Sequence, residues 1–188
     1  MFDILQRKIA DFKILWLVKE ILDSNNKETG KGIPIGNLTS QLFANVYLNE
    51  LDQFVKRDLK RRYYLRYMDD FLIFGTDKRE LWRIKKQIAE FLKTKLDLNL
   101  HPKKANVFPT AKGIEFLGYR NFRDYRVLRK STVKRFARRL KTYQSKIRNG
   151  KMEQEKLTLS LQSWLVFAKF ADSWHTRARI AKIGGLIP

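Results

Sequence analysis

The chain contains 188 residues, of which 44% are hydrophobic and 31% charged, a balance typical of a globular protein. Its 40 Lys and Arg against 19 Asp and Glu give a formal net charge of +21, which indicates a polyanionic partner. The absence of cysteine excludes disulfides and thiolate-bound zinc, and no apolar run approaches the length of a membrane span. We therefore expect a cytoplasmic protein that does not associate with membranes.

The opening segment is predicted to be helical. Residues 2–23 form two short stretches whose apolar side chains recur every three or four positions, and Asp11 is a suitable cap for the second stretch. A polar loop bounded by glycine follows over residues 24–32. A longer helix, capped by Asn37, is expected over residues 38–60 because its apolar residues keep the helical spacing.

The middle of the chain is predicted to combine strands with one more helix. Residues 63–67 and 71–74 are short β-rich runs separated by Met68-Asp69-Asp70, which is the pattern of a hairpin with a tight turn. An amphipathic helix is expected over residues 78–96. Two further strands are predicted over residues 98–108 and 114–122.

The remainder of the chain is predicted to be helical and strongly basic. One helix begins with Ser131 or Thr132 as its cap and ends at Gly150, and a final helix covers residues 155–171. Residues 119–151 contain thirteen Lys and Arg and one acid. This one-sided density favours a nucleic-acid-binding face over a solvated helix face, with an anionic membrane the least favoured interpretation.

The adjacent carboxylates Asp69 and Asp70 are the strongest chemical feature of the sequence. Aspartate is common in turns, so a random Asp-Asp pair is more often structural than functional. Hard cations need oxygen ligands, and two Mg²⁺ ions can promote an in-line phosphoryl displacement. A lone acidic turn in so basic a chain favours cation binding, but the spacing alone leaves both interpretations open.

Four blocks of the sequence resemble those of reverse transcriptases. Tyr67-Met68-Asp69-Asp70 resembles the Tyr-X-Asp-Asp box of that family, including the hydrophobic strand on each side. Residues 32–45 resemble the segment that lines the incoming nucleotide and the template, and residues 98–104 the segment with a lysine near the triphosphate. Residues 116–119 resemble the primer grip. Because the blocks keep the family's order, the resemblance is much more specific than four letters.

The resemblance implies an α+β fold in two parts. Residues 1–124 would form a partial polymerase palm domain, an antiparallel sheet with helices, and residues 125–188 a small basic helical thumb domain. The fingers and the first palm strand, which in this family carries a third metal-binding Asp, have no counterpart in the sequence. We therefore expect the chain alone to be almost inactive as a polymerase. A truncated sequence, one half of a split enzyme and a degenerate remnant are the alternatives.

Within the family, residues 35–41, Ile-Gly-Asn-Leu-Thr-Ser-Gln, are most similar to enzymes of diversity-generating retroelements. That similarity implies a bacterial or phage context. Group II intron and retron enzymes share the same blocks, so an intron maturase is an alternative. A non-catalytic nucleic-acid-binding remnant is an alternative of a different class.

The resemblance also assigns roles to individual residues. Asp69 and Asp70 would bind the two Mg²⁺ ions expected in the complete enzyme. Lys104, with Lys103 as the alternative, would act on the triphosphate. Nucleotide binding is assigned to Pro34, Ile35, Gly36, Gln41 and Tyr67. The primer grip would consist of Phe116, Leu117 and Gly118. Contacts with the nucleic-acid backbone are assigned to Arg129, Lys130, Lys134, Arg135, Arg138 and Arg139.

The partners implied by the resemblance are a template RNA, a DNA or RNA primer and deoxynucleoside triphosphates. A basic accessory protein is plausible from the family only.

Overall fold

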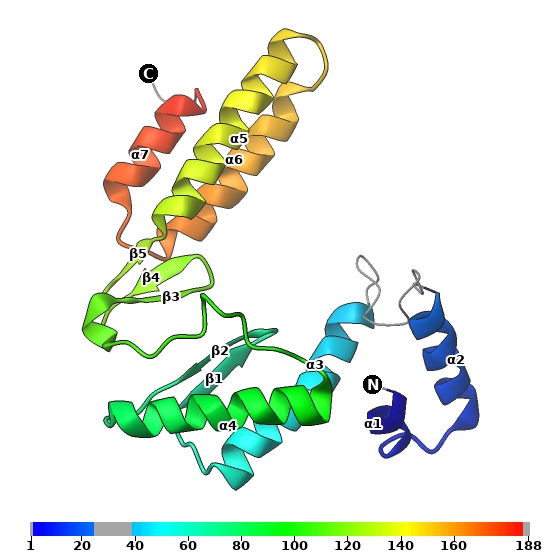
Figure 1. Ribbon diagram of the computed structural model, residues 1–188. Helices are drawn as coiled ribbons and strands as arrows, with labels where there is room; N and C mark the ends of the chain where they lie inside the picture. Colours follow the sequence, from blue (N-terminus) through cyan, green and yellow to red (C-terminus); the bar gives the residue numbers. More distant parts are fainter. Residues whose placement is uncertain (1, 25–38, 186–188) are drawn as a thin grey trace. The chain divides into compact units, whose positions relative to one another are not determined.

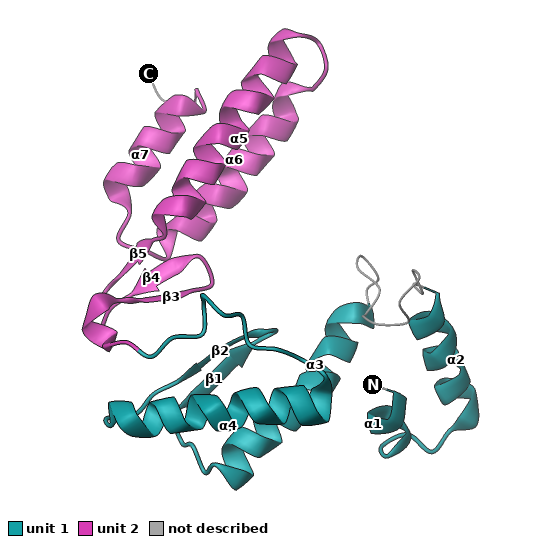
Figure 2. Ribbon diagram, in the orientation of Figure 1, with its two compact units in different colours: residues 1–107 teal, residues 108–188 magenta. Residues whose placement is uncertain are grey.

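A computed structural model describes residues 2–24 and 39–185, whose helices and strands are drawn in Figure 1. The chain divides into two compact units, Met1–Val107 and Phe108–Pro188 (Figure 2). This division falls earlier in the chain than the boundary at residues 124–125 that the composition indicates. Helices and small antiparallel sheets are both present, so the predicted α+β class is confirmed.

The first unit opens with helices α1 (Phe2–Gln6) and α2 (Phe12–Asp23), as the sequence predicts. Asp11 caps α2, because its Oδ1 accepts hydrogen bonds from the amides of Lys13 and Ile14 at 2.8 and 3.2 Å. A small apolar cluster of Leu5, Val18 and Phe43 holds these helices against the helix that follows. The predicted loop beyond Ser24 and the predicted Asn37 cap lie outside the described residues.

Two long helices form the main core of the first unit. Helix α3 (Thr39–Gln53) continues into a π-helical turn, Phe54–Asp58, so the helix expected over residues 38–60 is confirmed in its main part. Helix α4 (Lys78–Leu96) has the predicted bounds, and Asp77 caps it. The buried core comprises Leu51, Val55, Ile84, Ile88, Leu92 and Leu96. Their spacing places them on the facing sides of α4 and of α3 with its π-helical turn.

Strands β1 (Tyr64–Tyr67) and β2 (Asp70–Ile73) form the predicted hairpin beside these helices. The strand predicted over residues 98–108 is wrong, since this segment contains a turn and no strand. Pro102 has no N–H to donate to a strand partner, and the His101 carbonyl accepts from the amides of Lys104 and Ala105. These local bonds replace a β-ladder.

The second unit begins with a three-stranded antiparallel sheet formed by β3 (Ile114–Phe116), β4 (Tyr119–Asn121) and β5 (Arg126–Leu128). One continuous strand was expected over residues 114–122, and that expectation is wrong. Leu117 and Gly118 both adopt positive φ, at +51° and +86°, and reverse the chain in a two-residue turn.

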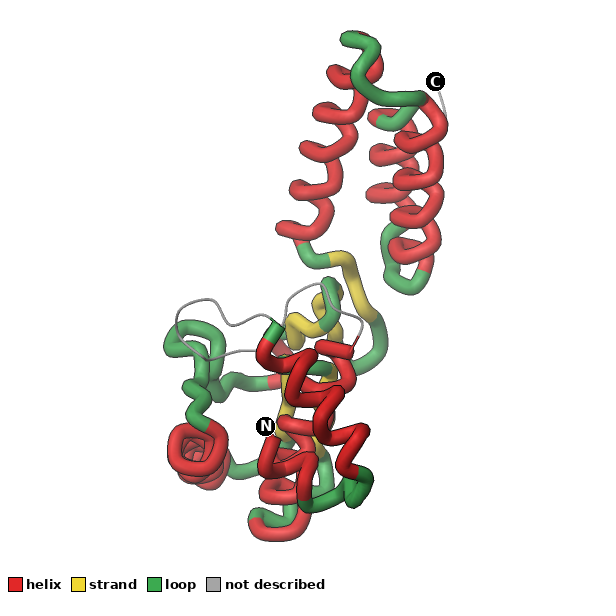
Figure 3. The backbone as a smooth tube through the Cα atoms, turned by 90° about the vertical axis from the view of Figure 1, so that its right-hand side faces the viewer, coloured by secondary structure: helices red, strands yellow, loops and turns green. Residues whose placement is uncertain are grey.

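Three helices complete the second unit: α5 (Lys130–Arg148), α6 (Gln154–Lys169) and α7 (Trp174–Ile183). They lie side by side in the views of Figures 1 and 3. Arg129, and not Ser131 or Thr132, occupies the N-cap position of α5. The final predicted helix is confirmed as α6, whereas α7 was not expected.

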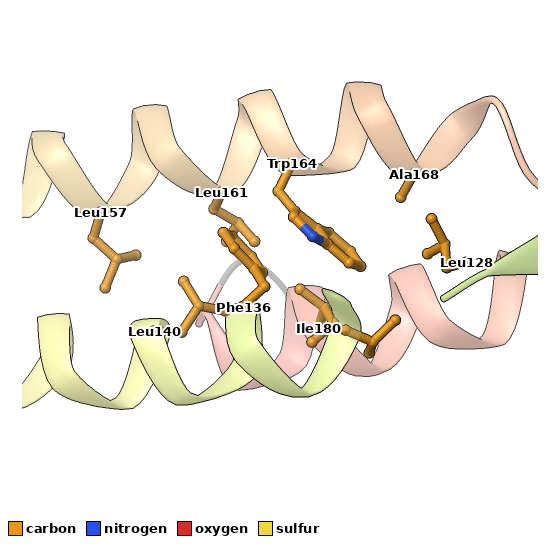
Figure 4. Packing of buried hydrophobic residues seen from close by; sticks show 9 residues of the cluster. Leu128, Phe136, Leu140, Leu157, Leu161, Trp164, Ala168 and Ile180 are labelled. Carbon is orange, nitrogen blue, oxygen red and sulfur yellow. The ribbon is translucent and has the colours of Figure 1, made fainter. Parts of the chain in front are cut away.

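The helices of the second unit enclose one continuous apolar core (Figure 4). Leu140, Leu161, Ala168 and Ile180 are fully buried in it. None of the helices in residues 2–24 and 39–185 is both long enough and apolar enough to cross a membrane.

Candidate active site

The acidic turn, residues 67–70, closes the hairpin of the first unit. Tyr67 pairs with Asp70 across the two strands, which leaves Met68 and Asp69 as the two turn residues. Asp70 is therefore the first residue of β2 and not part of the connecting turn, a small correction to the predicted boundaries. Both carboxylates are exposed to solvent, and Tyr67 beside them is also exposed.

The backbone of the turn is held in an unusual conformation. Met68 has a φ of +54°, in the left-handed region that a residue with a side chain rarely adopts. The carbonyl of Met68 accepts a hydrogen bond from Nη1 of Arg66 at 2.9 Å. The same nitrogen donates to Oδ1 of Asn45 on α3 at 3.0 Å, and the Asn45 amide lies 3.5 Å from the Met68 sulfur.

Arg66 is anchored on α3 by a second set of bonds. Its Nε and Nη2 donate to the two oxygens of Asp52 at 2.8 and 2.6 Å, and the Tyr64 hydroxyl donates to the same carboxylate at 2.7 Å. Burial alone would raise the pKa of Asp52, but the hydrogen bonds from Arg66 and Tyr64 hold it below its ordinary value. Burial and the neighbouring carboxylate raise the pKa of Tyr64 strongly. At neutral pH, therefore, the Asp52 carboxylate is ionised and accepts hydrogen bonds from the Arg66 guanidinium and from the neutral Tyr64 hydroxyl.

A cavity of about 270 Å³ lies beside the turn. Its lining is mostly apolar and comes from α3, β2, the end of α4 and Leu98, with Arg66, Asp69 and Asn99 as the polar members. Asp69 therefore borders both the solvent and a partly open cavity.

The predicted nucleotide-binding residues fall into two groups. Pro34, Ile35 and Gly36 lie outside the described residues. Gln41 is exposed in the first turn of α3, four residues before Asn45. Residues four apart share one face of a helix, so Gln41 lies on the side of α3 from which Asn45 reaches the acidic turn.

Lys104 is exposed in the turn that replaces the expected strand. The neighbouring residues Leu98 and Asn99 border the cavity together with Asp69, whereas Lys104 is not among its lining residues. The structure thus brings the start of the 98–104 segment to the acidic turn, but not Lys104 itself.

The predicted primer grip is the turn between β3 and β4 in the second unit. Phe116 pairs with Tyr119, and Leu117 and Gly118 form the tip between them. Leu117 is exposed although its side chain is apolar. The Gly118 carbonyl accepts a hydrogen bond from the Arg129 amide at 3.0 Å, which ties the tip to the start of α5.

The predicted backbone-binding residues form an exposed basic band along α5. All six, Arg129, Lys130, Lys134, Arg135, Arg138 and Arg139, are exposed, whereas Val133, Phe136 and Leu140 face the core. Two of the six have protein partners. Arg129 pairs with Glu115 at 2.8 Å, and Arg139 donates to Ser160 of α6 and lies over the ring of Phe136. The remaining four cations have no ion-pair partner in the described part of the chain, and they leave the band strongly positive.

The acidic turn presents oxygen donors of the kind that Mg²⁺ prefers. Asp69 and Asp70 offer hard oxygen donors on adjacent, exposed residues, which suits a cation that keeps water and substrate oxygens in its shell. Within the part of the chain that the structure describes, no group of three or more His, Cys, Asp or Glu could hold a metal ion. The turn therefore fits a partial ligand set of two carboxylates.

Comparison with known proteins identifies the family of this chain. Residues 2–121 match the family described as reverse transcriptase (RNA-dependent DNA polymerase). The match covers more than half of the chain, and the chain belongs to the reverse transcriptase family.

A more specific relative is the group II intron-encoded protein LtrA of Lactococcus lactis subsp. cremoris, including its strain MG1363. The two chains are 25% identical over an alignment of 205 positions, which covers 72% of this chain and 33% of the relative. The chain thus spans about a third of the length of the relatives it matches.

Arg66 and Asp52 are site residues that the sequence reasoning missed, whereas Asn45 was included only as the last residue of the block 32–45. One signal was available in β1. Arg66 lies two residues after Tyr64 and so shares its face of the strand, the face that packs against the helices. A charged side chain at such a position needs a partner. The identity of that partner, at a separation of 14 residues, was not accessible from spacing.

Proposed function

We propose that the chain is part of an RNA-directed DNA polymerase that adds deoxynucleotides to a primer 3′-hydroxyl on an RNA template. The observation that carries the proposal is the exposed Asp69-Asp70 pair on a braced hairpin turn, within a segment that belongs to the reverse transcriptase family. The proposed substrates are a template RNA, a DNA or RNA primer and deoxynucleoside triphosphates.

The chain's own residues would divide the work as follows. Asp69 and Asp70 bind Mg²⁺, and the bound ions supply activation of the primer hydroxyl and charge neutralisation on the departing pyrophosphate. Lys104 neutralises the triphosphate or protonates the leaving group. Pro34, Ile35, Gly36, Gln41 and Tyr67 contact the incoming nucleotide.

The second unit would hold the nucleic acid. The basic band on α5 contacts backbone phosphates, and four exposed cations without a protein partner in the described structure support this role. The tip formed by Leu117 and Gly118 contacts the primer, and its support is an exposed apolar side chain on a two-residue turn. Palm and thumb are the proposed names for residues 1–124 and 125–188.

Two carboxylates are a small ligand set for two divalent ions. We therefore propose that a third carboxylate, not among the residues described, completes the metal site of the active enzyme. Without it the chain would extend primers negligibly. The same observation favours a second candidate function, a nucleic-acid-binding protein without catalysis.

For the subfamily, our proposal is a diversity-generating retroelement enzyme, supported by the string at residues 35–41. The match to a group II intron-encoded protein supports the alternative of an intron enzyme with a maturase role. If the chain is a retroelement enzyme, we also propose a basic accessory protein as its partner and a bacterial or phage cytoplasmic setting.

Mn²⁺ binding, followed by electron paramagnetic resonance, tests the metal site without requiring catalysis. We expect the purified chain to bind Mn²⁺, and Asp69→Asn and Asp70→Asn each to weaken the binding by about tenfold or more. Asp124→Asn is the control, because it removes one exposed carboxylate from the second unit. Equal binding by all four proteins would refute the metal site and leave the non-catalytic candidate.

Primer extension on an RNA template separates the remaining alternatives. The chain alone is expected to give negligible product with Mg²⁺, while retaining the template–primer in a fluorescence anisotropy assay. Robust Mg²⁺-dependent extension by the chain alone would show that no further carboxylate is required.

A further inference from the structure

Arg66 connects helix α3 to the acidic turn through all three nitrogens of its guanidinium. Nε and Nη2 are occupied by the Asp52 carboxylate, and Nη1 bonds the Met68 carbonyl and Asn45. A guanidinium is planar, so fixing two of its nitrogens on a carboxylate also fixes the direction of the third. The bond to Met68 is therefore set by the orientation of Asp52.

Asp52 is itself held in place. Its Oδ1 accepts from both Tyr64 and Arg66, and it extends from a part of α3 whose neighbour Leu51 is almost completely buried in the core. The Arg66 side chain is only 10% exposed and the Asp52 side chain 27%. Little solvent reaches the pair, so it is screened less than a surface ion pair.

The bond from Arg66 ends on the strained residue of the turn. Met68 adopts a left-handed conformation that side chains disfavour, and such a conformation persists only where its surroundings hold it. Here the surroundings are the Arg66 bond to its carbonyl and the Asn45 contact with its sulfur. Asp69 follows Met68 directly, so the peptide plane that Arg66 holds also determines where the Asp69 backbone begins.

We propose that Arg66 is a positioning residue, which together with Asp52 and Asn45 fixes the orientation of the Asp69 carboxylate for metal binding. The metal-binding part of this inference rests on the proposed function. The turn-ordering part does not, because it follows from the hydrogen bonds alone.

The first unit offers a matched control. Arg61 pairs with Glu80 at 2.7 Å, so it is also an arginine with a carboxylate partner, partly exposed, and it has no contact with the turn among the bonds described. Arg66→Lys and Arg61→Lys make the same chemical change and keep the net charge. A lysine has one ammonium and cannot hold a carboxylate and a carbonyl in the fork geometry of arginine.

Hydrogen exchange of the amides of residues 67–71 measures turn order without any metal. We expect Arg66→Lys to speed exchange there by about tenfold while Arg61→Lys leaves it unchanged, with global stability monitored by circular dichroism. Asn45→Ala, which alters an exposed side chain of α3, should change exchange in the same direction by a smaller factor. The Asn45→Ala variant tests the proposal on its own in the event that Arg66→Lys does not fold. Wild-type exchange rates at residues 67–71 in a folded Arg66→Lys chain, or in Asn45→Ala where Arg66→Lys does not fold, would overturn the proposal.

Mn²⁺ affinity then measures the consequence for Asp69. We expect roughly 10- to 100-fold weaker binding in Arg66→Lys and wild-type binding in Arg61→Lys. A folded Arg66→Lys chain that binds Mn²⁺ as tightly as wild type would overturn the metal-positioning role. If the wild-type chain bound no Mn²⁺ at the turn, the proposed metal site would be wrong. Faster exchange in Arg66→Lys would still establish that Arg66 orders the turn.

Discussion

Phe136 of α5 and Trp164 of α6 stack face to face in the core of the second unit, with ring centroids 4.7 Å apart and an interplanar angle of 6°. Both rings are buried, at 4% and 7% exposure. The pair joins the helix that carries the basic band to the helix that supports it (Figure 4). This contact is therefore part of the packing that positions the band.

Phe136→Ala should destabilise the second unit by about 3–5 kcal/mol, because it removes a buried ring and leaves a cavity beside Trp164. Urea unfolding followed by circular dichroism measures the change. Phe170→Ala is the control, since Phe170 is 64% exposed and its loss should change stability by less than about 0.5 kcal/mol. Similar losses for both variants would contradict the packing described.

The tip between β3 and β4 gives a second prediction. Gly118 has a φ of +86°, and a Cβ added there would lie 3.1 Å from Cζ of Phe167. Gly118→Ala should therefore cost about 1–2 kcal/mol in the free energy of unfolding, measured by urea titration. Gly150→Ala is a useful comparison, because its φ is also positive but its Cβ would meet open space. A cost no larger than that of Gly150→Ala would show that Phe167 yields without strain.

Leu117 separates a structural from a functional role at the same tip. Leucine at a φ of +51° is unfavourable, whereas Asn tolerates that conformation, so Leu117→Asn should keep or raise stability by up to about 1 kcal/mol. If the tip contacts the primer, the same variant should bind a template–primer more weakly in an anisotropy assay. Unchanged binding by a stable Leu117→Asn chain would remove the primer-grip assignment.

The sequence was most informative where one local pattern dominates. The apolar spacing of residues 78–96 predicts α4 with its observed bounds, and Asp11 caps α2 as expected. The sequence failed where a two-residue turn interrupts a β-rich run. Leu117 in the left-handed region breaks an otherwise continuous β-rich run, and propensity gives no warning of a leucine there.

The acidic turn could be predicted, but not its support. Tyr67, Asp69 and Asp70 are adjacent in sequence, so one motif contains them. The Arg66–Asp52 pair depends on the packing of β1 against α3, which no local pattern specifies.

The basic band on α5 predicts a salt-dependent affinity for nucleic acid. Replacing Lys134 and Arg138 together by Gln should weaken binding of an RNA–DNA duplex. It should also reduce the magnitude of the negative slope of log K against log salt by about 1–2, close to one per lost phosphate contact. Lys86→Gln with Lys93→Gln on α4 removes the same charge from exposed positions elsewhere. Equal slopes for the two double variants would mean that net charge, and not the band, drives binding.

The Asp52 and Tyr64 network predicts opposite pH limits for the stability of the first unit. The folded pKa of Asp52 is below its ordinary 3.8, so its stabilisation is fully present above that value and is lost as the pH falls through the folded pKa. The folded pKa of Tyr64 is above its ordinary 10.0, so its stabilisation is fully present below pH 10.0 and is lost as the pH rises.

Tyr64→Phe and Tyr63→Phe test the alkaline limit with matched substitutions. Tyr64 bonds Asp52, whereas its neighbour Tyr63 is 62% exposed. Urea unfolding of the first unit between pH 7 and 11 should show wild-type stability falling above about pH 10, the same fall in Tyr63→Phe and a flatter profile in Tyr64→Phe. Since the Tyr64 hydroxyl also helps to hold the Asp52 pKa low, Tyr64→Phe should in addition begin to lose stability at a higher pH on the acid side. A loss of stability at alkaline pH that persists in Tyr64→Phe but disappears in Tyr63→Phe would contradict this prediction. It would also contradict the hydrogen bond by which Tyr64 holds Asp52, the partner of Arg66.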